Sequence, residues 1–172
     1  MYALRRSVAF SILPLLFVLP FFPPENGAPA GEENLYSRAL LASIIEMNKA
    51  YGHIDDSDGG SRVRTDYHHM LVERDPGITD DLPEQFAEYR VAYLDTQQLI
   101  ARYKELRKEF SILKIQPMRS EGASLKVLVS VYWVSYKNKK LNLGLSDWSE
   151  VEFRYDCEKQ SFVVSEVKLG GV

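Results

Sequence analysis

Strict alternation of apolar and other side chains marks the last third of the chain as a set of β-strands. Between residues 125 and 136, one alternating set is wholly apolar: Leu125, Val127, Val129, Val131 and Trp133. A second alternating stretch runs from Glu150 to Cys157. A period of two places such residues on one face of a strand, against a core. The pattern predicts strands over 111–118, 125–136, 150–157 and 162–169, joined as an antiparallel meander.

Turn-forming residues separate these predicted strands. Gly122 allows a turn after the first of them, and Asn138 in the polar run Lys137–Lys140 tolerates turn geometry. The return strand starts within Leu141–Leu145, and Gly144 predicts a β-bulge there.

Helical spacing dominates the preceding part of the chain. Apolar residues recur every three or four positions over 33–51, which predicts a first helix. A short helix is predicted over 66–74, and the spacing over 82–110 predicts a long helical region. Asp95 and Gln98 can form a capping box, so we expect that region to break near Asp95.

These elements predict an α+β domain. We expect a single domain over 31–172, helical over 33–110 and a β-meander over 111–169. The N-terminal helices are expected to pack on one face of a curved antiparallel sheet of four or more strands, since four strands suffice when helices cover them.

The N-terminal stretch has a different composition. Arg5 and Arg6 precede an almost wholly apolar run over 7–22, and Ala28-Pro29-Ala30 matches a small-x-small cleavage pattern. The apolar run is shorter than the roughly 20 residues that a spanning helix needs. We therefore expect a signal peptide over 1–30 and a secreted or periplasmic protein. The alternative is an uncleaved N-terminal anchor.

Overall charge limits the partners. The formal net charge is −3, so the sequence predicts no nucleic-acid partner and membrane contact only through an uncleaved N-terminus. The basic run Arg102–Lys108 suits the negative end of a helix dipole, with anion binding as the alternative. Cys157 is the single cysteine, which excludes an intrachain disulfide, and its phase with apolar neighbours predicts a buried side chain.

The sequence contains no complete catalytic, metal-binding or nucleotide-binding motif. Asp56, Asp58 and Gly59 resemble a calcium loop, but Ile54 stands where an oxygen ligand is needed and Thr65 where an acid is needed. We therefore expect no metal and no cofactor. Acid–base chemistry in a pocket would have to use a small set of candidates: Asp66, His68, His69, Tyr89 and Asp95.

The order of helices followed by a curved meander resembles the nuclear transport factor 2-like, or cystatin-like cone, group over roughly residues 33–169. In that group the helices pack on the concave face of the sheet and the other face often forms a dimer. One strand here has a half-apolar outer face that predicts such an interface: Leu128, Tyr132, Val134 and Tyr136.

Three functions follow from these patterns. The first is an exported, non-catalytic domain that binds a protein or a small molecule and forms a homodimer through the sheet. The second is a small pocket enzyme of the lyase or isomerase type. The third is a structural envelope component tethered by an uncleaved N-terminus.

Overall fold

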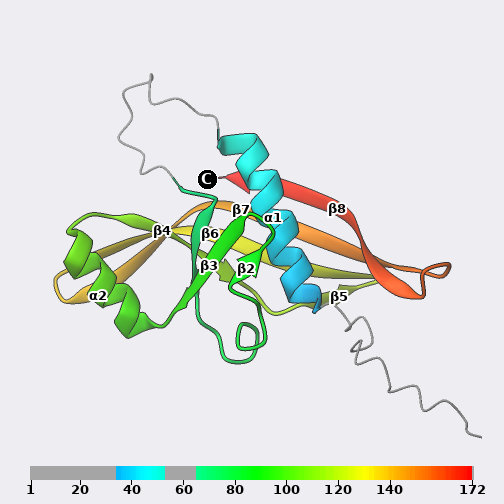
Figure 1. Ribbon diagram of the computed structural model, residues 1–172, viewed down its shortest axis with the longest axis horizontal. Helices are drawn as coiled ribbons and strands as arrows, with labels where there is room; N and C mark the ends of the chain where they lie inside the picture. Colours follow the sequence, from blue (N-terminus) through cyan, green and yellow to red (C-terminus); the bar gives the residue numbers. More distant parts are fainter. Residues whose placement is uncertain (1–33, 53–64, 172) are drawn as a thin grey trace, which may run out of the picture. The chain divides into compact units, whose positions relative to one another are not determined.

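The computed structural model describes residues 34–52 and 65–171. The unit Gly31–Val172 is separate from Met1–Ala30 and is described by itself. Its described elements are two helices and eight strands: α1 (Leu35–Tyr51), β1 (His69–Glu73), β2 (Gln85–Phe86), β3 (Tyr89–Leu94), α2 (Thr96–Leu106), β4 (Phe110–Ile115), β5 (Arg119–Glu121), β6 (Ser124–Lys137), β7 (Lys140–Asp156) and β8 (Ser161–Gly171). Figure 1 shows their arrangement.

All eight strands form one sheet, which confirms the α+β class. The strand order is β2-β3-β1-β4-β6-β7-β8, and β5 pairs with β6. The sheet is mixed, because β1 runs parallel to both β3 and β4 while the other pairs are antiparallel. The prediction of a wholly antiparallel sheet was therefore wrong in its first half.

Three of the extra strands, β1, β2 and β3, form where the sequence predicted helix, whereas β5 forms where it predicted a turn. Residues 69–73 form β1, where Met70 and Val72 are buried, and residues 89–94 form β3, where Tyr89 and Val91 are buried. The spacing of Tyr89 and Tyr93 fits a helix, but the intervening Val91 fits a strand equally well. The parallel pairing of β1 with β3 favours the strand, because it buries Met70 and Val72 of β1 together with Tyr89 and Val91 of β3.

The predicted break at Asp95 is confirmed. The Asp95 side chain accepts a hydrogen bond from the Gln98 N–H at 2.8 Å, and the Gln98 side chain accepts one from the Asp95 N–H at 2.8 Å. This capping box satisfies two N–H groups at the start of α2. The helix ends at Arg107, which adopts a left-handed conformation with φ of 54°.

The predicted meander is also confirmed. Strand β6 pairs with β7 over its whole length, from Ser124 to Lys137, and a tight turn joins them in which Asn138 and Lys139 have φ angles of 52° and 62°. Two positive φ angles are typical of the hairpin turn that matches strand twist. The expected bulge occurs two residues after Gly144: Leu145 and Asp147 face adjacent residues of β6, which leaves Ser146 as the extra residue.

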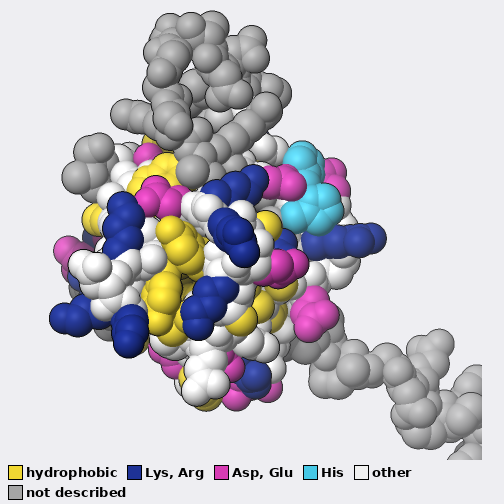
Figure 2. Space-filling model, turned by 90° about the vertical axis from the view of Figure 1, so that its left-hand side faces the viewer, with side chains coloured by type: hydrophobic (Ala, Val, Ile, Leu, Met, Phe, Trp, Pro, Cys, Tyr) yellow, Lys and Arg dark blue, Asp and Glu magenta, His cyan; other side chains and the backbone are white. Residues whose placement is uncertain are grey.

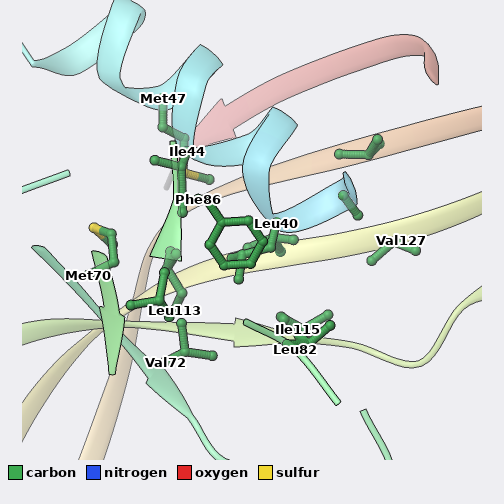
Figure 3. Packing of buried hydrophobic residues seen from close by; sticks show 14 of the residues in the cluster. Leu40, Ile44, Met47, Met70, Val72, Leu82, Phe86, Leu113, Ile115 and Val127 are labelled. Atoms are coloured by element: carbon green, nitrogen blue, oxygen red, sulfur yellow. The ribbon is translucent and has the colours of Figure 1, made fainter. Parts of the chain in front are cut away.

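Helix α1 covers one face of the sheet. Leu40, Ile44 and Met47 are fully buried against the sheet (Figure 3). The buried hydroxyl groups of Ser43 and Ser149 lie 2.6 Å apart and join α1 to β7 by a hydrogen bond. Both hydrophobic clusters of the described chain lie between residues 35 and 169, so a chain that begins at Gly31 retains the whole described core.

Helix α2 packs on the other side of β4. Leu113 and Ile115 belong to the cluster beneath α1, whereas Phe110 and Ile112 belong to a second cluster that contains Leu99 of α2. Because side chains alternate along a strand, these two sets point to opposite faces. The two helices therefore cover different faces, whereas the sequence predicted both on one.

Candidate functional site

Four of the five candidate acid–base residues lie close together at the start of β1 and β3. The Nδ1 atom of His69 lies 3.0 Å from Oδ2 of Asp66. The His68 ring stacks on the Tyr89 ring, with the centroids 5.4 Å apart and the planes 11° apart. Asp95 is not part of this cluster, because it lies beyond the far end of β3 and caps α2.

The electrostatics of the Asp66–His69 pair do not suit general base catalysis. Partial burial acts to raise the pKa of Asp66, but hydrogen bonds from His69 and from the backbone of His68 outweigh it, so the pKa is lowered. The side chains are 62% and 66% exposed. A catalytic carboxylate that works near neutral pH needs a raised pKa, which usually requires burial.

An open hollow lies beside this cluster. Its volume is about 430 Å³, and its lining comes from β1, β2, β3 and the residue before β2: His69, Met70, Leu71, Glu84, Gln85, Arg90, Val91 and Ala92. Of the candidate residues, only His69 lines it. Glu84 and Arg90 place one negative and one positive side chain in this lining, and both could bind charged groups of a ligand.

No group of three or more His, Cys, Asp or Glu side chains in the described parts of the chain is placed to hold a metal ion. The residues that resemble a calcium loop, Asp56, Asp58 and Gly59, lie outside the described residues. Cys157 is exposed, which contradicts the predicted burial. It follows Tyr155, which is 52% exposed, so the buried face of β7 ends before the alternating sequence pattern does.

The predicted dimer face does not form one open surface. Val134 is fully buried in the cluster beneath α2, and Tyr132 packs against that cluster. The Tyr136 ring lies beside the Tyr103 ring, with Lys104 Nζ 5.5 Å from its centroid. Helix α2 thus occupies most of the face that the sequence left without a partner.

A different surface, which the sequence analysis did not identify, lies where α2 meets the β6–β7 hairpin. We call it the α2–hairpin surface. Its apolar members are Tyr103, Leu106, Tyr136, Leu141, Leu143 and Leu145, and its basic members are Arg102, Lys104, Arg107, Lys108, Lys137, Lys139 and Lys140. Leu143 and Leu145 are 37% and 43% exposed. Figure 2 shows hydrophobic side chains here with Lys and Arg side chains around them.

The charge of this surface is opposite to that of the chain. Segments 102–109 and 137–140 hold seven basic residues and two acids, a formal charge of +5, whereas the chain has −3. Glu105 pairs with Arg102 at 3.1 Å, and Glu109 lies 3.7 Å from Lys137. The other five cations have no ion-pair partner among the described residues: Lys104, which lies over the Tyr136 ring, and Arg107, Lys108, Lys139 and Lys140.

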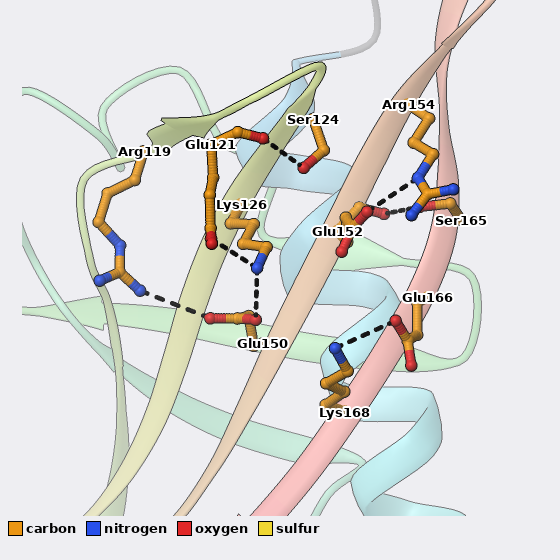
Figure 4. A network of polar contacts seen from close by, with 10 residues as sticks. All are labelled: Arg119, Glu121, Ser124, Lys126, Glu150, Glu152, Arg154, Ser165, Glu166 and Lys168. Atoms are coloured by element: carbon orange, nitrogen blue, oxygen red, sulfur yellow. Dashed lines mark hydrogen bonds and ion pairs between the residues drawn. The ribbon is translucent and has the colours of Figure 1, made fainter.

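Another part of the same sheet shows the contrast. On β5 to β8, four basic residues are matched by four glutamates (Figure 4): Arg119, Lys126, Arg154 and Lys168 with Glu121, Glu150, Glu152 and Glu166. Hydrogen bonds from Lys126 and Arg154 are the main cause that lowers the pKa values of Glu121 and Glu152. The four positive and four negative charges of this network cancel. The α2–hairpin surface, by contrast, carries an excess of positive charge.

The strand edge next to the exposed leucines is also open. Strand β8 pairs with β7 only from Asp147 to Asp156, so Lys140–Leu145 pair with β6 on one side alone within the described chain. An unpaired edge with exposed apolar side chains favours contact with another molecule.

Comparison of the chain with protein-family models, curated proteins and solved structures found no match. The resemblance to the nuclear transport factor 2-like group therefore stays a prediction. Among the described residues, neither helix has the length and apolar character required to span a bilayer.

Proposed function

We propose that the protein is an exported, non-catalytic binding domain and that the α2–hairpin surface contacts its partner. One observation carries the proposal: Leu143 and Leu145 are exposed on the same β-hairpin as Lys139 and Lys140, which have no ion-pair partner in the described chain. Binding of a partner is favoured when it buries exposed apolar side chains, because these side chains leave water. The cations favour a partner that carries negative charge.

The same charges argue against a homodimer at this surface. A two-fold axis would place two surfaces of charge +5 against each other, and like charges that face one another oppose association. The burial of Val134 also removes the centre of the interface that the sequence predicted. The proposed partner is therefore a different, negatively charged molecule.

Site-specific photo-crosslinking tests this proposal in the cells that produce the full chain. A photoreactive phenylalanine analogue replaces Leu145 in one variant and Tyr155, which is 52% exposed, in the matched control. We expect adducts, to protein or lipid, at position 145 only, and fewer of them when K139Q and K140Q are added. Equal adduct yields at the two positions, or none at 145, would contradict the proposal.

The hollow beside His69 supports a second candidate, a pocket that binds a small molecule or acts as a lyase or isomerase. Its specific support is the hollow itself, in which Glu84 and Arg90 bring charges of both signs next to His69. Native mass spectrometry of the purified protein would reveal a retained compound. Arg90→Ala should lose it, whereas His68→Ala should keep it, because His68 does not line the hollow. Absence of any compound in the wild type would count against the pocket.

A further inference from the structure

We infer that the α2–hairpin surface docks on an anionic lipid bilayer. The inference rests on the proposed function and names the chemistry of the partner. It differs from anchoring by the N-terminal segment, because every residue that takes part lies between 102 and 145.

The apolar part of the surface suits the boundary of the hydrocarbon layer. Leu141, Leu143 and Leu145 alternate along β7, so they project from one face of the strand. Leu143 pairs with Val134, and Leu145 pairs with Tyr132, which places both leucines on the face that carries α2. Leucine side chains on such a face contribute to binding when they leave water for the acyl-chain boundary.

Tyrosines and basic residues belong to the same α2–hairpin surface as these leucines. Tyr103 and Tyr136 stand in ring contact where α2 meets β6, and tyrosine favours the interfacial region of a bilayer because its ring is apolar and its hydroxyl polar. Arg107 and Lys108 follow α2, and Lys139 and Lys140 form the hairpin turn and the start of β7. Their long aliphatic stems can lie along apolar surface while the charged groups reach lipid phosphates.

The distribution of charge favours a bilayer over an acidic protein. The cations without an ion-pair partner in the described chain come from two neighbouring segments, one after α2 and one at the β6–β7 turn, so the positive charge is spread over a surface instead of converging on one point. A bilayer offers the matching arrangement, with anionic headgroups above hydrocarbon and no fixed register. The hollow, which would suit a discrete ligand, is lined by β1 to β3 instead.

Vesicle co-sedimentation of a chain that begins at Gly31, which retains the described core, tests the inference. We expect the protein to pellet with vesicles of phosphatidylglycerol and phosphatidylcholine at low salt, and to remain in solution with phosphatidylcholine alone or at high salt. Each basic residue near an anionic surface contributes about fivefold in affinity, so K139Q/K140Q should bind about 30-fold more weakly.

A matched variant separates the surface from overall charge. K49Q/K159Q removes two exposed lysines on α1 and on the β7–β8 turn, and it should bind within about twofold of the wild type. L143S/L145S should weaken binding about tenfold with its salt dependence kept. Circular dichroism establishes that each variant is folded before its binding is compared.

Three results would overturn the inference: no pelleting with the anionic vesicles, equal pelleting with both vesicle types, or equal weakening in the two lysine pairs. Poly-L-glutamate serves as the competing probe. If it binds with the same dependence on Lys139 and Lys140 while vesicles do not, the bilayer inference is wrong and the proposed function stands. Failure of the proposed function itself would appear as equal or absent crosslinking at position 145.

Discussion

Replacement of Leu99 by alanine should detach α2 from the sheet and so dismantle the α2–hairpin surface. Leu99 is fully buried, and it is the buried residue of this helix. It packs in the cluster with Phe110, Ile112 and Val134. A helix of 11 residues is marginal in water by itself, so α2 depends on this contact.

The expected loss can be worked from the side chain. Leu99→Ala removes three carbon atoms from a site with no exposure, and each buried carbon group contributes about 0.8 kcal/mol. The transfer term is then about 2.4 kcal/mol, and the remaining cavity brings the cost to about 3 kcal/mol. If α2 opens locally, its amide protection factors should fall about 100-fold.

Hydrogen exchange and urea denaturation together provide the assay. Exchange measures protection in α2, and the urea midpoint measures global unfolding. Ile100→Ala is the matched control, because Ile100 is only half-buried and lies outside the cluster of Leu99. Protection of α2 that is unchanged in Leu99→Ala, or reduced equally in Ile100→Ala, would refute the reasoning that one buried leucine holds this helix.

Asp95→Ala should cost about 1 kcal/mol by urea denaturation, whereas Asp95→Asn, which keeps an N-cap, should cost far less; equal losses would contradict the capping role. Gly170→Ala should lower stability by about 1–3 kcal/mol, because the new Cβ would overlap the Trp148 ring, whereas Gly144→Ala has open space and should be tolerated. Burial is the main cause that raises the pKa of Tyr67 to about 12. Because the unfolded tyrosine ionises near pH 10, its contribution is present below about pH 10 and declines as pH rises towards about 12. Tyr67→Phe should therefore make the alkaline fall in the urea midpoint shallower, and an unchanged slope would argue against this contribution.

Local sequence signals were sufficient where neighbouring residues decide the structure. The helix over 35–51, the capping box at Asp95 and the turn at Asn138 were all predicted, because each depends on contacts within a few residues. The β6–β7 pairing followed from alternation, since a shift by one residue would expose the whole apolar set.

The first half of the sheet could not be predicted in the same way. Met70 and Val72 gain their burial from β3 and β4, which pair with β1 on its two sides. Parallel pairing joins residues that are distant in sequence and leaves no turn signal between them. Short apolar runs of this kind fit a helix and a strand equally well, so the packing decides.

For the candidate site, the sequence supplied the residue types but not their arrangement. Asp66 and His69 were both candidates, and their pairing follows from a separation of three residues. The stacking of His68 on Tyr89 required the pairing of β1 with β3. The exposed leucines were missed because Leu143 lies in an alternating apolar pattern that is typical of a buried strand face. Only the structure shows that Leu143 lies outside the cluster packed beneath α2 and is exposed.

The sequence by itself determined the fold class, the first helix, the start of α2 and the strand meander, because propensity, capping and alternation act locally. Only the tertiary structure decided which apolar face is covered and which cations lack an ion-pair partner within residues 34–52 and 65–171. Net charge sums over the whole chain, whereas binding depends on charges that lie near one another. Segments 102–109 and 137–140 are far apart in sequence and adjacent in space, so their combined charge of +5 becomes a surface property only after folding.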